Sequence, residues 1–307
     1  MTSDLRRLYL FHAFNGIAIC LVGSNLFRDR LFLHLDLNMS QFGAIGGTAP
    51  FVALAVALAV SPLLTRLRID GPIVAVCYLL RVAAPFLFLV VPMFTRDRQV
   101  LTVCFAAVFT LSLVFPFIGQ NSLGVLFRAV IRDAQLGRHM SNITVLWAVP
   151  GYLLAVPCSW LVDRAAASGE HAFFATYFVI FSITAVFQLP ASWVVWGVRA
   201  QREASEPAPA VTFRDIAEPL KHQRFRPLLA AAFALSVLVH MVSTFSIPYL
   251  MRGQGLTMAQ ISVIDALMAA AGLGVAMMWG RLADRFGPRN VVRLCALGAA
   301  VGVMMTA

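Results

Sequence analysis

The sequence predicts an all-α, polytopic transmembrane helical bundle with about nine spans. Of its 307 residues, 60% are hydrophobic and only 12% are charged, which is too apolar for a soluble domain of this length. The apolar residues form runs near the roughly 20 residues that cross a bilayer as a helix. The net charge is +10, but the basic residues stand in short clusters between these runs. That pattern indicates membrane topology and excludes a nucleic-acid partner.

Nine apolar segments are predicted to span the bilayer. They cover residues 8–27, 42–64, 72–95, 99–120, 142–162, 172–197, 227–250, 258–279 and 291 to the end. The first is too long for a cleaved signal and has no small-residue cleavage pattern, so it is expected to remain as a helix. The five cysteines are scattered through these runs without a metal-binding spacing, so neither disulfides, a metal nor a cofactor is predicted.

Lysine and arginine are unevenly distributed between alternate loops. The sparser set is predicted to lie outside the cell and holds Arg28, Arg30, Arg96, Arg98, Arg164 and Arg252. The richer set shares the side of the N-terminus, which is therefore predicted to be cytoplasmic, in a bacterial inner membrane. The longest polar interruption suggests three parts: a six-helix half over 1–198, a cytoplasmic linker over 199–226 and a partial second half over 227–307.

One loop, between the segments 258–279 and 291 to the end, carries a specific motif. Its members are Gly280, Asp284, Arg285, Gly287 and Arg289. Glycine permits a tight turn and arginine retains a loop in the cytoplasm. Neither of these requirements explains why an acid stands at Asp284. The pattern GxxxDRxGxR between two apolar spans resembles the signature loop of the major facilitator superfamily (MFS) between its eighth and ninth spans. Pro288 stands where that family usually has a second basic residue.

The resemblance implies two six-helix halves, each built from inverted three-helix repeats. A degenerate copy of the loop, Ser61 to Arg68, follows the second segment, as duplication would require. Because members have twelve spans, the chain is expected to be truncated after the ninth. The loop is expected to have a gating role, in which Asp284 meets the start of the fifth span near Arg138 when the cytoplasmic side closes.

The resemblance also implies that the first, fourth and seventh spans line a solute path. Helical projection places His12, Asn15, Gly16 and Gly23 on one face of the first span. The candidate path residues are Asn15, Thr110, Asn121, Ser236, His240, Ser243 and Thr244. For the serines and threonines, close packing between helices is an equally good interpretation.

Two ionisable residues lie deep within predicted spans. Asp265 is a candidate for ion coupling, or alternatively makes a structural hydrogen bond near a helix end. Arg81 lies on a span that the family places at the periphery, so an internal strut is favoured over solute binding.

The function predicted from these features is secondary transport of a small solute by alternating access, with protons as a candidate coupling ion. The alternative is a non-transporting protein of the same fold: a sensor, a partner subunit or an inactive remnant. No nucleotide loop or catalytic acid–base arrangement is found, so an enzyme is not predicted. The expected partners are the solute and the lipid bilayer, and a monomer is expected.

Overall fold

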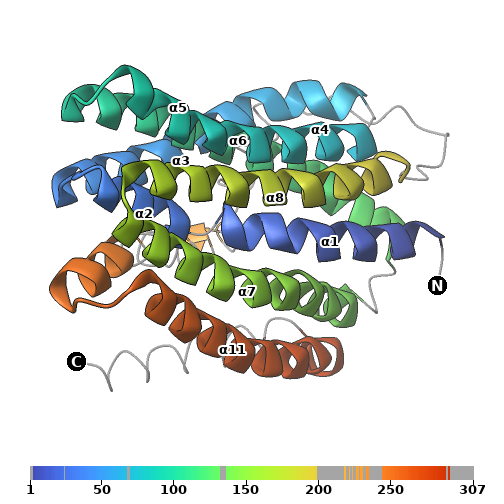
Figure 1. Cartoon of the computed structure of the whole chain (residues 1–307). Helices are drawn as coiled ribbons and strands as arrows, with labels where there is room; N and C mark the ends of the chain where they lie inside the picture. The colour runs from blue at the N-terminus through green and yellow to red at the C-terminus, as the bar shows by residue number, and fades with distance from the viewer. Residues whose placement is uncertain are drawn as a thin grey trace.

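The structure is a computed structural model that describes residues 3–23, 25–67, 70–131, 136–198 and 244–287, with isolated positions between 218 and 234 and at 290. Side chains are not described at 61–67, 276–277, 279–280 and 283–284. Within these residues the chain is helical and contains no strand. Figure 1 shows the long helices lying side by side across the molecule.

The described helices agree with most of the predicted spans but are longer. The first to third spans are α1 Ser3–Leu21 with α2 Asn25–His34, then α3 Met39–Leu67, then α4 Asp70–Ala83, η1 Ala84–Phe86 and α5 Leu87–Phe94. The remainder are α6 Arg98–Val130, α7 Leu136–Ser168, α8 Glu170–Trp196, the π-helical turn η3 Tyr249–Gly253 and α11 Met258–Phe286.

Seven of these segments are long and apolar enough to cross a membrane, against the nine predicted. The predicted spans 227–250 and 291–307 lie mostly or wholly outside the described residues, as does most of the linker 199–226. Large apolar side chains are exposed on the described helices, among them Phe51, Leu153 and Trp193. Such side chains fit a surface that faces lipid.

In two of the spans the α-helix is interrupted part-way along its length. In the first, α1 ends at Leu21 and α2 resumes at Asn25. In the third, Pro85 falls within the 3-10 turn that joins α4 to α5. Proline lacks a backbone donor and clashes with the preceding turn, which accounts for the second break.

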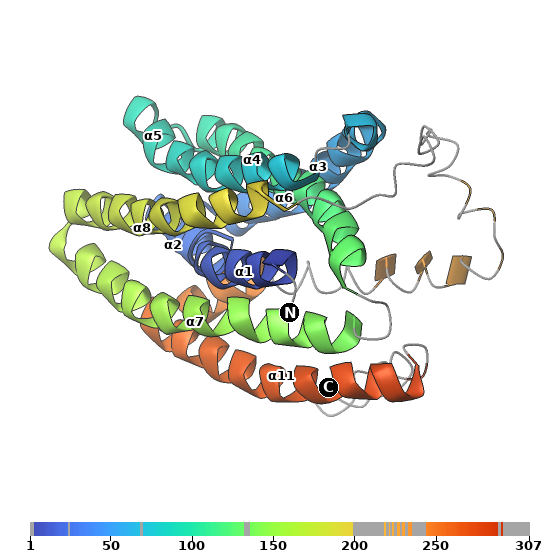
Figure 2. The same cartoon turned by 90° about the vertical axis from the view of Figure 1, so that its right-hand side faces the viewer.

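The helices alternate in direction, which gives the bundle two ends. The end where α1 begins is called the N-terminal end here, and the opposite one, where α3, α6, α8 and α11 begin, the far end. At the N-terminal end Arg7 donates a hydrogen bond to the carbonyl of Gly197, 2.7 Å away. In Figure 2, α11 lies along α7, which is the helix it contacts most, and it also touches α2.

The helices α3 and α11 begin in the same way at the far end. The backbone N–H of Gln41 donates to Asn38 Oδ1 at 2.9 Å while Asn38 N–H donates to Gln41 Oε1 at 2.8 Å. Thr257 and Gln260 make the same reciprocal pair at 2.9 and 3.2 Å. Each is a capping box that satisfies two backbone donors of the helix end.

Asp36 and Gly255, each two residues before the first residue of its box, both have positive φ, at 57° and 66°. The sequence spacing between the two boxes also equals that between the two loop copies at Ser61 and Gly280. The internal repeat predicted from the loops therefore extends to the other end of the same helices.

Buried apolar side chains gather mainly toward the two ends. The larger group includes stacked aromatic rings of the far end, such as Phe32 against Phe105 with centroids 4.9 Å apart. A second group, around Leu8, Phe11 and Leu126, packs the helices near the N-terminal end. The space between them contains the candidate site.

Candidate functional site

A cavity of about 680 Å³, called the main cavity below, lies within the first-half bundle. Its wall is formed by α1 (His12, Asn15, Ile19), α3 (Leu54, Ala57, Leu58), α4 (Tyr78, Arg81), α6 (Leu113, Pro116, Phe117, Gln120, Asn121, Leu123, Phe127) and α7 (Met140, Ile143, Thr144, Trp147). These positions fall in the middle of the helices and toward the N-terminal end. The aromatic packing described above fills the far end instead.

The polar face of α1 contributes two buried side chains to this wall. Asn15 is 1% exposed and His12 is 7% exposed. Neither the amide atoms of Asn15 nor the ring nitrogens of His12 have a hydrogen-bond partner in the described structure. Buried polar groups are normally satisfied, so four unpaired polar atoms on two residues of the cavity wall make this part of α1 a candidate for binding a ligand or water.

Close backbone approach sets the position of α1 against α7. A Cβ on Gly16 would lie 2.1 Å from the carbonyl oxygen of Trp147, and one on Gly151 would lie 2.3 Å from Cys20 Sγ. Only glycine fits at such a crossing, as is common between membrane helices. Gly16, predicted on the polar face of α1, therefore serves helix packing and brings Asn15 close to α7.

Arg81 of α4 projects toward the break between α1 and α2. A Cβ on Gly23 would lie 2.1 Å from its Nη2 atom, and its guanidinium carbon lies 5.8 Å from the ring centre of Tyr78. Arg81 also borders a second, small cavity of about 50 Å³, together with Arg28. Within the described residues no carboxylate lies within ion-pairing distance of Arg81.

The prediction that Arg28 and Arg30 lie in a loop is wrong, because both belong to α2. Arg28 and Asp29 are buried, and Arg28 Nε donates to Asp29 Oδ1 at 2.8 Å. The guanidinium of Arg28 also lies 4.2 Å from the ring centre of Phe109. The neighbouring acid and the ring satisfy this charge, so the apolar helix continues to His34.

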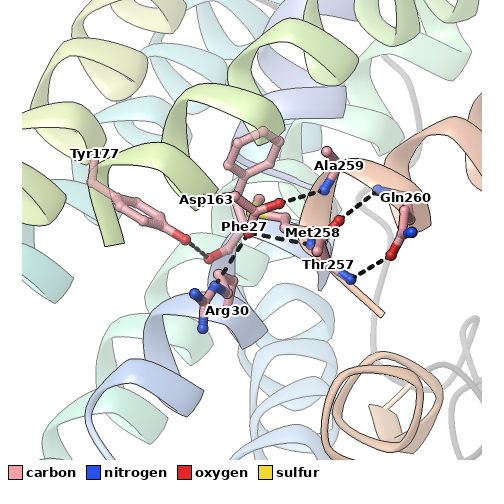
Figure 3. A network of polar contacts seen from close by, with 8 residues as sticks. All are labelled: Phe27, Arg30, Asp163, Tyr177, Thr257, Met258, Ala259 and Gln260. Atoms are coloured by element: carbon pink, nitrogen blue, oxygen red, sulfur yellow. Dashed lines mark hydrogen bonds and ion pairs between the residues drawn. The ribbon is translucent and has the colours of Figure 1, made fainter. Parts of the chain in front are cut away.

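At the far end, Asp163 of α7 joins the two halves of the chain (Figure 3). Its Oδ2 accepts a hydrogen bond from the N–H of Ala259 at 2.8 Å, and Oδ1 accepts one from the N–H of Met258 at 3.3 Å. These are unpaired donors at the start of α11, where the helix dipole also favours a negative charge. Arg30 Nε lies 3.9 Å from Asp163 Oδ1.

Asp163 therefore fixes the start of α11 to α7 at the end away from the main cavity, and α11 then continues along α7. Asp163 was not among the residues predicted from the sequence to be functional. An acid near the end of an apolar span, with no motif around it, gives no signal that it faces another helix start.

A family model described as the MFS_1 like family matches residues 27–307. The chain belongs to the MFS_1 like family. No curated protein and no solved structure matches it. The family match agrees with the resemblance inferred from the loop at Gly280 to Arg289. Together with the seven apolar helices, it indicates a multi-pass membrane protein of a family whose members are generally transporters.

In this MFS-type chain, the structure separates the predicted path residues. Asn15 and Asn121 both line the main cavity. Thr110 donates its hydroxyl to the carbonyl of Ala106 at 2.7 Å, within α6. Thr244 is buried, and a Cβ on Gly46 of α3 would lie 2.6 Å from its methyl carbon. For Thr244 this favours the packing interpretation that the sequence left open.

Ser236, His240 and Ser243 lie outside the described residues, so their predicted place on the solute path stays a prediction. Asp265 is half-buried on α11 and lies within electrostatic range of Tyr152 on α7, away from the main cavity. Its role in ion coupling also stays a prediction. Within the described residues, no three His, Cys, Asp or Glu side chains form a group that could hold a metal ion.

The signature loop is described in part. α11 ends at Phe286, and Gly287 follows with φ of 82°. A left-handed glycine after the last helical residue is a common helix terminator, and it explains the glycine of the motif. The guanidinium of Arg285 lies 5.3 Å from the ring centre of Phe286. The surroundings of Gly280 and the side chain of Asp284 are outside the described part, as is Arg289.

Proposed function

We propose that this chain is a secondary transporter that moves a small solute across the membrane by alternating access of its two halves. The observation that carries the proposal is the main cavity, whose volume is about 680 Å³. It is lined by the unpaired polar side chains of His12 and Asn15 in the middle of membrane-length helices. A cavity of this size suits a small organic molecule.

The contact between α7 and α11 supports the same proposal. Its hydrogen bonds to Asp163 lie at the far end, while the cavity lies toward the N-terminal end. With the N-terminus in the cytoplasm of a bacterial inner-membrane protein, as the basic loops predict, this arrangement corresponds to a state closed to the outside. Opening would require Asp163 to release the start of α11.

A gradient of ions is the proposed driving force, with protons as the candidate ion. The loop at Gly280 to Arg289 is proposed to close the cytoplasmic side in the opposite state. We propose that the protein acts as a monomer with the solute as its partner.

The test is a comparison of solutes in cells with and without the chain. Intracellular and external solutes are measured by mass spectrometry after growth in a complex medium. Asn121→Trp should abolish any difference, because the new ring would project into the main cavity and obstruct it. The matched control is Gly124→Trp on the same helix, since Gly124 is exposed and a Cβ there would meet no atom within 4 Å.

Transport through the cavity is supported if a solute is distributed differently in cells that contain the parent chain or Gly124→Trp than in cells without the chain. The same solute should show no such difference in cells that contain Asn121→Trp. If no solute changes while the protein is present in the membrane, the non-transporting alternative is favoured. Collapsing the proton gradient then separates coupled transport from facilitated diffusion.

A further inference from the structure

We propose that the main cavity binds a small organic monocarboxylate with an apolar body, and that Arg81 is the residue that anchors the carboxylate. This inference rests on the proposed transport function and names its class of substrate. It goes against the sequence-based expectation that Arg81 is an internal strut.

The first argument is charge. Arg81 carries the single formal charge among the residues that line the main cavity, and the small cavity beside it adds only Arg28. A cation deep in a membrane protein is costly unless it has a partner or borders water. Because the described residues offer Arg81 no carboxylate, an acid that arrives as ligand would complete the pair.

The comparison with Arg28 shows what a structural arginine looks like in this bundle. Arg28 Nη2 lies 2.6 Å from Asp29 Oδ1, and the side chains of both residues are 8% exposed or less. Arg28 is thus neutralised by its own neighbour in sequence. Arg81, which also lines the small cavity, lies instead against the ring of Tyr78 and the backbone of Gly23.

The second argument is preorganisation of the guanidinium. Tyr78 is 1% exposed and lies one helical turn before Arg81 on α4. Gly23 lacks the Cβ that would clash with Nη2. These two contacts hold the planar group in place while leaving its donors available, which suits bidentate recognition of a carboxylate.

The third argument concerns the rest of the molecule that would bind. Much of the wall is apolar or aromatic, for example Leu54, Phe117 and Trp147. Asn15 and His12 supply unpaired hydrogen-bonding atoms. A single available cation matches one negative charge, and the apolar wall matches an aliphatic or aromatic body, so a monocarboxylate fits better than a phosphate ester or a sugar.

The experiment measures binding to the purified chain in nanodiscs by isothermal titration. The probes are hexanoate and benzoate, each with its neutral amide and its amine of similar shape. The expected result is that the carboxylates bind at least tenfold more tightly than the amides and that the amines do not bind. Equal binding of acid and amide, preference for the amine, or no binding of any probe would overturn the proposal.

Two variants test the anchor. Arg81→Gln should reduce carboxylate affinity to that of the amide, while Arg164→Gln should leave it unchanged. Arg164 is a matched control because its guanidinium also lies over a ring, 5.5 Å from the centre of Trp160, but outside the cavity. Unchanged carboxylate binding in Arg81→Gln would exclude Arg81 as the anchor.

If Arg81→Gln does not fold, Arg81→Lys replaces it. Lysine retains the charge but not the planar pair of donors, so carboxylate binding should weaken at least threefold yet still exceed amide binding. No weakening would contradict the anchoring role. The solute comparison described above is an independent test. Transport of a neutral solute would refute the substrate class and leave the transport function intact. Carboxylate binding without any transported solute would refute the transport function and leave the binding of a carboxylate intact.

Discussion

Removal of the Asp163 carboxylate should release the far-end contact between the two halves. In Asp163→Ala, the backbone donors of Met258 and Ala259 lose their acceptors at 3.3 and 2.8 Å. Loss of such a cap costs about 0.5–2 kcal/mol, and loss of the charge at the helix dipole about 0.3–1 kcal/mol. Arg30 adds little, since at 3.9 Å and about one-fifth exposure the pair is weak.

The combined loss is therefore roughly 1–3 kcal/mol, which corresponds to a shift of about 5- to 150-fold in an equilibrium between two states. If the contact holds the far end closed, the open state should become more populated by this factor. Asp163→Asn retains an acceptor and loses only the charge. It should therefore shift the equilibrium by only about two- to fivefold.

The assay is the rate at which a cysteine near the contact reacts with a membrane-impermeant maleimide in intact cells. Ser262→Cys is a suitable reporter, because Ser262 lies one turn into α11, is 1% exposed and has no hydrogen-bond partner for its hydroxyl in the described structure. The five native cysteines are first replaced by serine or alanine. The labelling rate should rise in proportion to the open population.

Asp97→Ala provides the matched control. Asp97 also caps a helix at the far end, accepting from the N–H groups of Gln99 and Val100 at 2.8 and 2.9 Å, but it does so within α6 and joins no other helix. Its loss should leave the labelling rate unchanged. An equal rate in Asp163→Ala and in the parent would refute the reasoning, and so would an equal increase in Asp97→Ala.

Three further predictions follow from the fold and the sequence. Gly151→Ala should lower the melting temperature in detergent, with a destabilisation of roughly 1–3 kcal/mol, because the new Cβ would lie 2.3 Å from Cys20 Sγ. Gly272→Ala should not lower the melting temperature, because a Cβ there would meet no atom within 4 Å. An epitope tag in the linker 199–226 should be inaccessible from outside intact cells, and external labelling would reverse the predicted orientation. Asp284→Asn should slow transport of an identified solute at an unchanged protein level in the membrane, and normal transport would leave the loop without a gating role.

Much of the architecture could be read from the sequence. Hydropathy over about 20 residues reports whether a segment lies in lipid, so the spans 42–64 and 172–197 were found within three residues of α3 and α8. The span 142–162 lies within α7, which extends six residues further at each end. The charged loop motif predicted the superfamily, and the family match confirms it to that extent. The motif also predicted a turn at its glycine, and Gly287 has a left-handed conformation directly after the last residue of α11.

Hydropathy failed where a charge was neutralised locally. Arg28 and Asp29 look like part of a polar loop, yet they are adjacent, form an ion pair and remain buried in α2. A scale that scores residues one by one counts both charges as unfavourable, although the pair together presents much less charge to its surroundings. The first span therefore extends beyond its predicted end at residue 27 to His34.

The sequence by itself determined the class of protein, its spans and the polar face of the first helix, because these depend on composition and on periodicity within one segment. Only the tertiary structure decided which faces meet. It places Asn15, Arg81 and Asn121, from three different helices, around one cavity, and it sets Thr244 against Gly46 instead. Such contacts depend on where helices cross. Crossings are set by how residues on separate helices fit together, as where Gly16 and Gly151 allow close backbone approach, and no single stretch of sequence contains both partners.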